Sequence, residues 1–154
     1  MKKFILPVIN LISMVLAGVI FGLGANTAVE FKPTGAGAGN WYQLVWELSE
    51  KPNLFGLIGF FLLCVGAFAL LVTLLPFKAR KYVVLVVGLM LVGAGVMFFL
   101  SPRAVYGYEV VKNANCIGRN YVRTDSLIAM MILAFVAGGL EILGAVVELL
   151  PEKK

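Results

Sequence analysis

Histidine is absent from this 154-residue chain, and cysteine and charge are scarce. The two cysteines, Cys64 and Cys116, lie far apart and form no CxxC pair. Zinc sites and thiol redox relays need clustered cysteine or histidine, so the sequence predicts no metal site and no redox site. It also shows no nucleophile–base pair and no phosphate-binding glycine loop. We therefore expect no enzyme activity and no cofactor.

Charged residues make up only 14% of the chain, hydrophobic residues make up 61%, and the mean hydropathy is +0.97. Soluble domains are about 25% charged and about 45–50% apolar, so both departures indicate lipid as the solvent. The net charge of +5 gathers in short basic clusters beside apolar runs, at 2–3, 78–81 and 153–154. This distribution is typical of membrane orientation signals. No aromatic–basic surface accompanies it, so nucleic acid is not an expected partner.

Four apolar runs are long enough to cross a bilayer as helices, which takes roughly 18 residues or more. They cover 4–24, 54–76, 82–100 and 127–150, and none contains Lys, Arg or Asp. Only helices satisfy their own backbone in hydrocarbon, so we predict an all-α membrane protein, a four-transmembrane-helix bundle with residues 1–154 as a single domain. The first run also resembles a secretory signal peptide. It exceeds the usual apolar core of about 7–15 residues, which favours a retained helix.

The basic clusters also predict an orientation. Positive residues favour the cytoplasm, so we expect both termini and the short turn at 78–81 inside, and the longer loops 25–53 and 101–126 outside as a small extracellular cap. The outer loops contain no Asn-x-Ser/Thr glycosylation acceptor, which fits a bacterial cytoplasmic membrane. Cys116 lies alone in the second outer loop, as a possible intermolecular thiol or simply a tolerated one.

The outer loops contain two segments with structural signals. Asn40 is a plausible N-cap for a short helix whose aromatic residues Trp41 and Trp46 are predicted to lie in the headgroup layer, with an extracellular contact surface as the alternative. Residues 106–110 suggest a strand that could pair with residues 29–31 in the first loop. Either feature would belong to the expected cap.

Small residues mark two helices for close packing. The first apolar run carries a GxxxG pair, and one face of the last run is also rich in small side chains, which lets helix backbones approach closely in lipid. The candidate helix-packing residues are Gly18, Gly22, Ala134, Gly138 and Ala145.

Glu141 is the most unusual residue, because it lies near the middle of the last apolar run. It is roughly nine residues from the end of that run, so about 13 Å deep at about 1.5 Å per residue. At that depth desolvation favours the neutral carboxyl. The same depth in the first helix falls at Ser13, with Asn10 one turn below, so either could bond to it. Such a carboxyl serves either as interhelical hydrogen-bonding glue or as an ion or proton site.

Two hypotheses for function follow, with a membrane enzyme that acts on lipid as a third possibility. The first is a non-catalytic integral membrane protein that works through helix–helix association, as a homo-oligomer or as an accessory subunit of a larger membrane complex. The alternative is a small channel or transporter subunit with Glu141 on an ion or proton pathway. The lipid bilayer is the expected partner in both.

Overall fold

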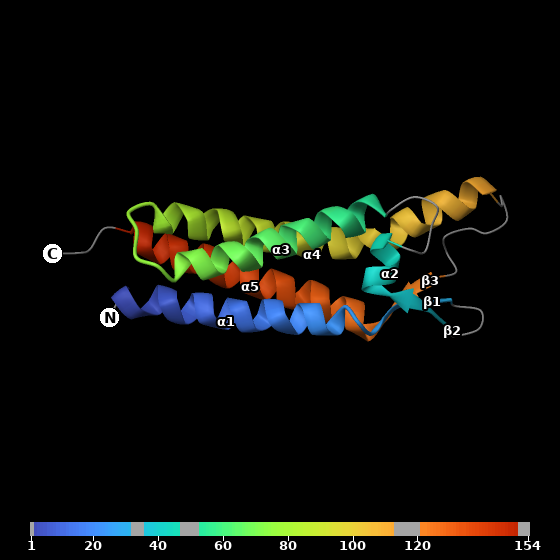
Figure 1. Cartoon of the computed structure of the whole chain (residues 1–154), viewed down its shortest axis with the longest axis horizontal. Coiled ribbons are helices and arrows are strands. Elements are labelled where there is room, and N and C mark those ends of the chain that lie inside the picture. Colours follow the sequence, from blue (N-terminus) through green and yellow to red (C-terminus); the bar gives the residue numbers. More distant parts are fainter. Residues whose placement is uncertain (1, 32–35, 47–52, 113–120, 151–154) are drawn as a thin grey trace.

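The protein is described by a computed structural model, in which residues 2–31, 36–46, 53–112 and 121–150 are placed. Four long helices in these residues lie side by side and pack together (Figure 1). They are α1 (Lys2–Leu23), α3 (Leu54–Thr73), α4 (Arg80–Lys112) and α5 (Asp125–Leu149). Each contains a stretch long and apolar enough to cross a membrane: Ile5–Leu23, Leu54–Thr73, Arg80–Ser101 and Asp125–Leu149.

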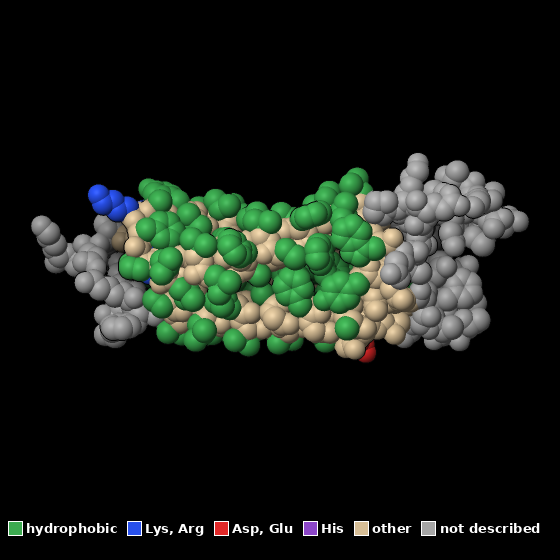
Figure 2. Space-filling view, viewed as in Figure 1, with side chains coloured by type: hydrophobic (Ala, Val, Ile, Leu, Met, Phe, Trp, Pro, Cys, Tyr) green, Lys and Arg blue, Asp and Glu red, His purple; other side chains and the backbone are tan. Residues whose placement is uncertain are grey.

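The side of the bundle is covered with large apolar side chains (Figure 2). Phe61, Phe68 and Leu143 are each more than half exposed, at 55%, 69% and 62%. A soluble bundle would bury such residues, since exposed apolar patches of this extent are rare in water. Together with the lengths of the four helices, this surface makes the chain a multi-pass membrane protein.

The two ends of the bundle differ. The start of α1, the turn between α3 and α4, and the end of α5 lie together at one end, and the short strands lie at the other (Figure 1). Four antiparallel passes joined in sequence require this arrangement. It matches the predicted grouping of the termini with the basic turn.

One predicted strand is wrong. Residues 106–110 lie within α4, which runs on to Lys112 instead of ending near residue 100. The β-propensity of Tyr and Val depends on context, and here continuation of a long helix overrides it. In contrast, α3 ends at Thr73, just before Pro76, because proline disfavours helical geometry in the residue ahead of it.

The strands form a small antiparallel sheet from both outer loops, which we call the loop sheet. It consists of β1 (Thr27–Phe31), β2 (Ala36–Asn40) and β3 (Tyr121–Arg123), in the order β2-β1-β3. Residues 29–31 therefore do pair with the second loop, as expected, but their partner is β3. Arg123 ties the sheet to α4, since its Nη2 donates to the Phe99 carbonyl at 2.8 Å.

A short helix, α2 (Trp41–Trp46), closes this end of the bundle. Asn40 caps it as predicted, because its Oδ1 accepts from the backbone N–H of Gln43 at 2.9 Å. Trp41 is fully buried, in an edge-to-face contact with Phe98 at 4.9 Å between ring centroids. It therefore belongs to the core, and only Trp46, which is 52% exposed, is left as a candidate for the headgroup layer.

Candidate functional site

Four polar side chains from three helices meet inside the bundle, and we call them the polar cluster. Asn10 and Ser13 come from α1, Thr73 from the end of α3, and Glu141 from α5. All four have 0% exposure. Buried polar groups in lipid need partners, so this juxtaposition is the strongest candidate for a functional site in the described residues.

The sequence places these residues at one level of the bundle. Glu141 lies eight residues before the end of α5 at Leu149, which is about 12 Å at about 1.5 Å per residue. Asn10 lies eight residues after the start of α1 at Lys2, and the two helices pack side by side. The structure thus brings together the three polar residues singled out in the sequence.

The Asn10 side-chain amide lies at the centre of the cluster. One end of it is 2.9 Å from Oε2 of Glu141 and 3.0 Å from the Leu6 carbonyl. The other end is 2.6 Å from the hydroxyl of Thr73. A single side chain therefore connects α1, α3 and α5.

The donors and acceptors around the Asn10 amide decide which of its ends is the nitrogen. With nitrogen towards Glu141, it donates to Oε2 and to the Leu6 carbonyl, and its oxygen accepts from the Thr73 hydroxyl. With oxygen towards Glu141, its nitrogen donates to the Thr73 hydroxyl, which donates to the Leu70 carbonyl at 2.7 Å. That second orientation would place the amide oxygen against two acceptors, Oε2 and the Leu6 carbonyl, so the nitrogen faces Glu141.

Glu141 is incompletely satisfied. Its Oε1 atom is buried and has no hydrogen-bond partner among the described residues. The Ser13 hydroxyl interacts with the carboxyl and also donates to the Ala137 carbonyl at a long 3.5 Å. A buried acceptor without a partner carries a desolvation cost of about 1–3 kcal/mol, so this site is not simply an optimised structural hydrogen bond.

Arg80, the first residue of α4, is the cation whose charge acts on Glu141. Its Nε and Nη2 atoms are buried and find no hydrogen-bond partner in the part of the chain that is described. The two residues form no salt bridge within the described structure. An orphaned acceptor and an orphaned guanidinium edge thus lie on the same side of the bundle, towards the turn between α3 and α4.

The predicted helix-packing residues fall into two groups. Ala134, Gly138 and Ala145 are buried inside the chain itself. A Cβ on Gly138 would lie 2.7 Å from the Gly88 carbonyl oxygen and 2.8 Å from the Val92 nitrogen, so α4 and α5 touch backbone to backbone here. The small face of α5 is therefore used for internal packing and is not free for a partner.

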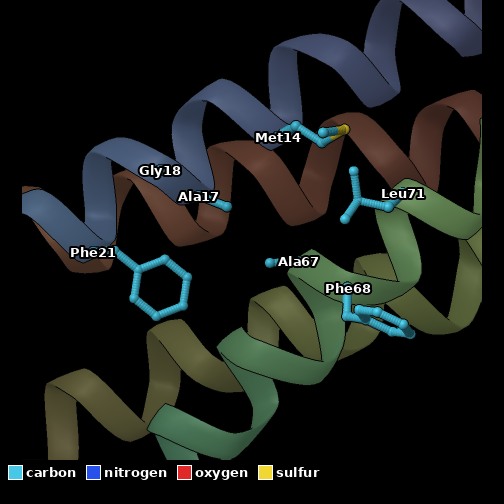
Figure 3. Close-up of a pocket in the computed structure, with 7 residues that line it drawn as sticks. All are labelled: Met14, Ala17, Gly18, Phe21, Ala67, Phe68 and Leu71. Carbon is cyan, nitrogen blue, oxygen red and sulfur yellow. The ribbon is translucent and has the colours of Figure 1, made fainter.

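Gly18 and Gly22 form the second group. Both are exposed on α1, and no described atom outside their own helix backbone lies within 4 Å of a Cβ built on either residue. Gly18 also borders an apolar groove of about 340 Å³ between α1 and α3 (Figure 3). The groove is lined by Met14, Ala17, Gly18, Phe21, Ala67, Phe68 and Leu71.

Three contributors to these sites were missed in the sequence: Thr73, Arg80 and Gly88. Thr73 is the only hydroxyl residue in 54–73, and that isolation was a usable signal. Gly88 gave no signal, because glycines are frequent throughout the apolar runs. The candidate thiol Cys116 lies outside the described residues. No group of three or more metal-ligating side chains occurs in the described ranges.

The fold and the polar cluster define a class: a four-span helical membrane protein with a carboxyl side chain buried in its core. Comparison with known proteins found no matching family model, no matching curated protein and no matching solved structure.

Proposed function

We propose that this chain is a non-catalytic membrane protein that acts through helix–helix association, as a self-assembling subunit. The observation that carries the proposal is the open pair Gly18 and Gly22 on α1. Other glycines in the bundle, such as Gly59, Gly88 and Gly138, are each in close contact with a neighbouring helix, whereas these two are not.

Small residues matter more in lipid than in water. Lipid tails are as apolar as leucine, so transmembrane helices associate through close packing, and a GxxxG pair lets two backbones approach. The occupant we propose for this face is α1 of a second copy. A two-fold contact places the same glycine pair on both sides, which makes the surface complementary to itself.

The proposed membrane is a bacterial cytoplasmic membrane, with the basic end of the bundle facing the cytoplasm. Lys78 and Lys81 flank the turn between α3 and α4 at that end. The loop sheet and α2 would then lie outside as the extracellular cap. The support for this orientation is the positive-inside rule.

Native mass in a mild detergent or nanodisc, with bound detergent and lipid subtracted, tests the association. The variant is Gly18→Leu, which blocks close approach on α1 and whose Cβ has no described atom within 4 Å outside its own helix backbone. The matched control is Gly139→Leu on α5, where nothing described lies within 4 Å either. We expect a discrete oligomer for the wild type and the control, and a folded monomer for Gly18→Leu. Equal masses for all three proteins would refute the proposal.

The polar cluster favours a second candidate function, a small channel or transporter subunit with Glu141 on an ion or proton pathway. Ionisable residues inside a membrane are costly and commonly mark such pathways. Replacing Glu141 with Gln should abolish flux into vesicles while preserving the fold, and Glu148→Gln, two turns nearer the end of α5, should leave it unchanged. Wild-type flux in Glu141→Gln would exclude this pathway.

A further inference from the structure

The groove between α1 and α3 exists because small residues line its middle. Ala17 and Gly18 come from α1 and Ala67 comes from α3, and none of them has a side chain long enough to fill the space (Figure 3). Longer side chains, among them Phe21 and Leu71, lie towards the two ends of the groove (Figure 3). The result is a space of about 340 Å³ whose lining contains no polar residue.

The groove lies in the part of the chain that crosses the membrane and is open to its surroundings. All of its lining residues fall within the spans Ile5–Leu23 and Leu54–Thr73. Gly18 is exposed, and Phe68 is 69% exposed. The volume is at the lower limit for small-ligand pockets, which hold about 300–1,000 Å³. A helix with its side chains is about 10–12 Å across and does not fit into such a space, whereas a single hydrocarbon chain does.

The end of the bundle on which α1 begins is positively charged. Lys2 and Lys3 are the first residues of α1, and Lys78 and Lys81 flank the turn that follows α3. Glu148 is the only acidic residue in the described part of this end. Basic residues at the membrane surface attract anionic headgroups, so this end is complementary in charge to an anionic lipid.

Helix register connects the groove with this charged end. Positions three and four apart lie on the same face of a helix. Steps of four, three and four residues back from Met14, which lines the groove, lead through Pro7 to Lys3. Lys3 is thus on the groove face of α1, about 16 Å from Met14 at about 1.5 Å per residue. One leaflet of a hydrocarbon layer about 30 Å thick spans about 15 Å, so a lipid tail that starts at the level of Lys3 ends at the groove.

We propose that the groove between α1 and α3 binds one acyl chain of an anionic phospholipid, whose phosphate lies in the headgroup layer at the level of Lys3. The apolar lining recognises the chain, and the basic start of α1 selects the headgroup. This lipid site goes beyond both candidate functions and depends on neither. Gly18 belongs to the groove and to the association face, so the experiments below leave it unchanged.

Native mass spectrometry of the full chain tests the lipid site. The protein is stripped of lipid in detergent and titrated separately with phosphatidylglycerol and phosphatidylcholine that carry the same oleoyl chains. We expect one phosphatidylglycerol per chain, bound about fivefold more tightly than phosphatidylcholine, which is the contribution of one basic residue near the surface. Phosphatidylcholine that binds as tightly as phosphatidylglycerol would overturn the selection of the headgroup.

Filling the groove should remove the lipid. Ala67→Phe places a ring among the lining side chains and should abolish both lipid adducts. The matched control is Val65→Phe on the same helix, because Val65 is 48% exposed and does not line the groove. Circular dichroism establishes that both variants fold. Full lipid binding by a folded Ala67→Phe would overturn the proposal. A lower oligomeric mass for this variant with unchanged lipid adducts would assign the groove to a second copy of the chain.

Removing one charge tests the headgroup. Lys3→Gln should lower the affinity for phosphatidylglycerol to that for phosphatidylcholine and leave the latter unchanged. Lys81→Gln removes the same charge at the same end, but Lys81 belongs to α4, where its Nζ lies 5.3 Å from the centroid of the Tyr82 ring. We expect this control to keep the preference. An equal loss in both variants would show a general attraction to the basic end and no headgroup site on α1.

Photo-cross-linking tests the site in the wild-type chain, where no variant has to fold. Phosphatidylglycerol with a diazirine near the end of one acyl chain is added to phosphatidylcholine vesicles that contain the protein. We expect cross-links within 14–21 and 67–71, the segments that line the groove. Cross-links spread evenly over the four helices would overturn the proposal. Such a result would leave the association through α1 to be decided by the native masses of Gly18→Leu and its control.

Discussion

The helix pair α4–α5 is closely packed, whereas the pair α1–α3 is loosely packed. Helices α4 and α5 make the most extensive contact in the bundle and touch backbone to backbone at Gly88 and Gly138. Helices α1 and α3 meet over a smaller area, joined at one end by the 2.6 Å contact between Asn10 and Thr73. One turn beyond Asn10 the pair opens into the apolar groove (Figure 3).

The difference shows what each pair can do. Backbone contact through glycine leaves no room for rearrangement, so α4–α5 is a fixed support. A pair joined by one polar contact leaves a groove that has room for a side chain or a lipid tail. The candidate sites of this molecule therefore lie on the loosely packed side, on α1 and α3, and α5 contributes only Glu141.

The largest loss of stability is expected at the backbone contact between α4 and α5. Gly138→Leu would drive side-chain atoms into the Gly88 carbonyl and the Val92 nitrogen, which are backbone groups and cannot move aside. Overpacking costs typically about 1–3 kcal/mol and sometimes more, so we expect a loss of roughly 3 kcal/mol or failure to fold. Thermal unfolding in detergent measures it. Gly139→Leu, one position along, is the control and should unfold like the wild type.

A smaller effect is expected at the polar contact of the open pair. Thr73→Val removes the hydroxyl that joins α3 to Asn10, and hydrogen bonds between membrane helices average about 0.6 kcal/mol. Thr73→Ser keeps the hydroxyl and should restore the wild-type stability. If Thr73→Val cost as much as Gly138→Leu, α1–α3 would be as rigidly held as α4–α5, and the contrast between the two pairs would be lost.

The smallest expected effect is a gain in stability. Ala67→Leu adds side-chain volume to the groove between α1 and α3, where space is available. Cavity-filling changes commonly stabilise by about 0.5–2 kcal/mol, and an exposed groove belongs at the lower limit. A slight rise in the unfolding temperature is the expected readout. A marked fall would mean that the two helices approach more closely in the membrane and that no groove exists there.

Periodicity and composition were sufficient for the four helices, because a run of 20 apolar residues in lipid has no alternative backbone structure. They also led to Glu141, Asn10 and Ser13, since polar residues are conspicuous in such runs. The sequence could not show which small residues pack against other helices of the same chain. Gly138 and Gly18 are chemically the same, and only the path of the neighbouring helices makes one buried and the other open.

Local sequence patterns also could not predict where α4 ends or which strand pairs with β1. Tyr and Val at 106–110 suit either a strand or a helix, and the choice falls to the long helix that precedes them. Once α4 extends to Lys112, the chain returns to β1 only at Tyr121–Arg123. Pairing between the two loops was predictable, but the segment that pairs with β1 was not.

The loop sheet has a consequence for how the molecule is built. The bond from the Thr124 hydroxyl to the Thr27 carbonyl spans 97 residues, and Thr124 directly precedes α5. A chain made from its N-terminus therefore carries β1 with one open edge until α4 is complete. When β3 fills that edge, it fixes the point from which α5 starts. The last helix, which carries the buried carboxyl, would thus enter a membrane already holding its three neighbours from a position chosen by the sheet.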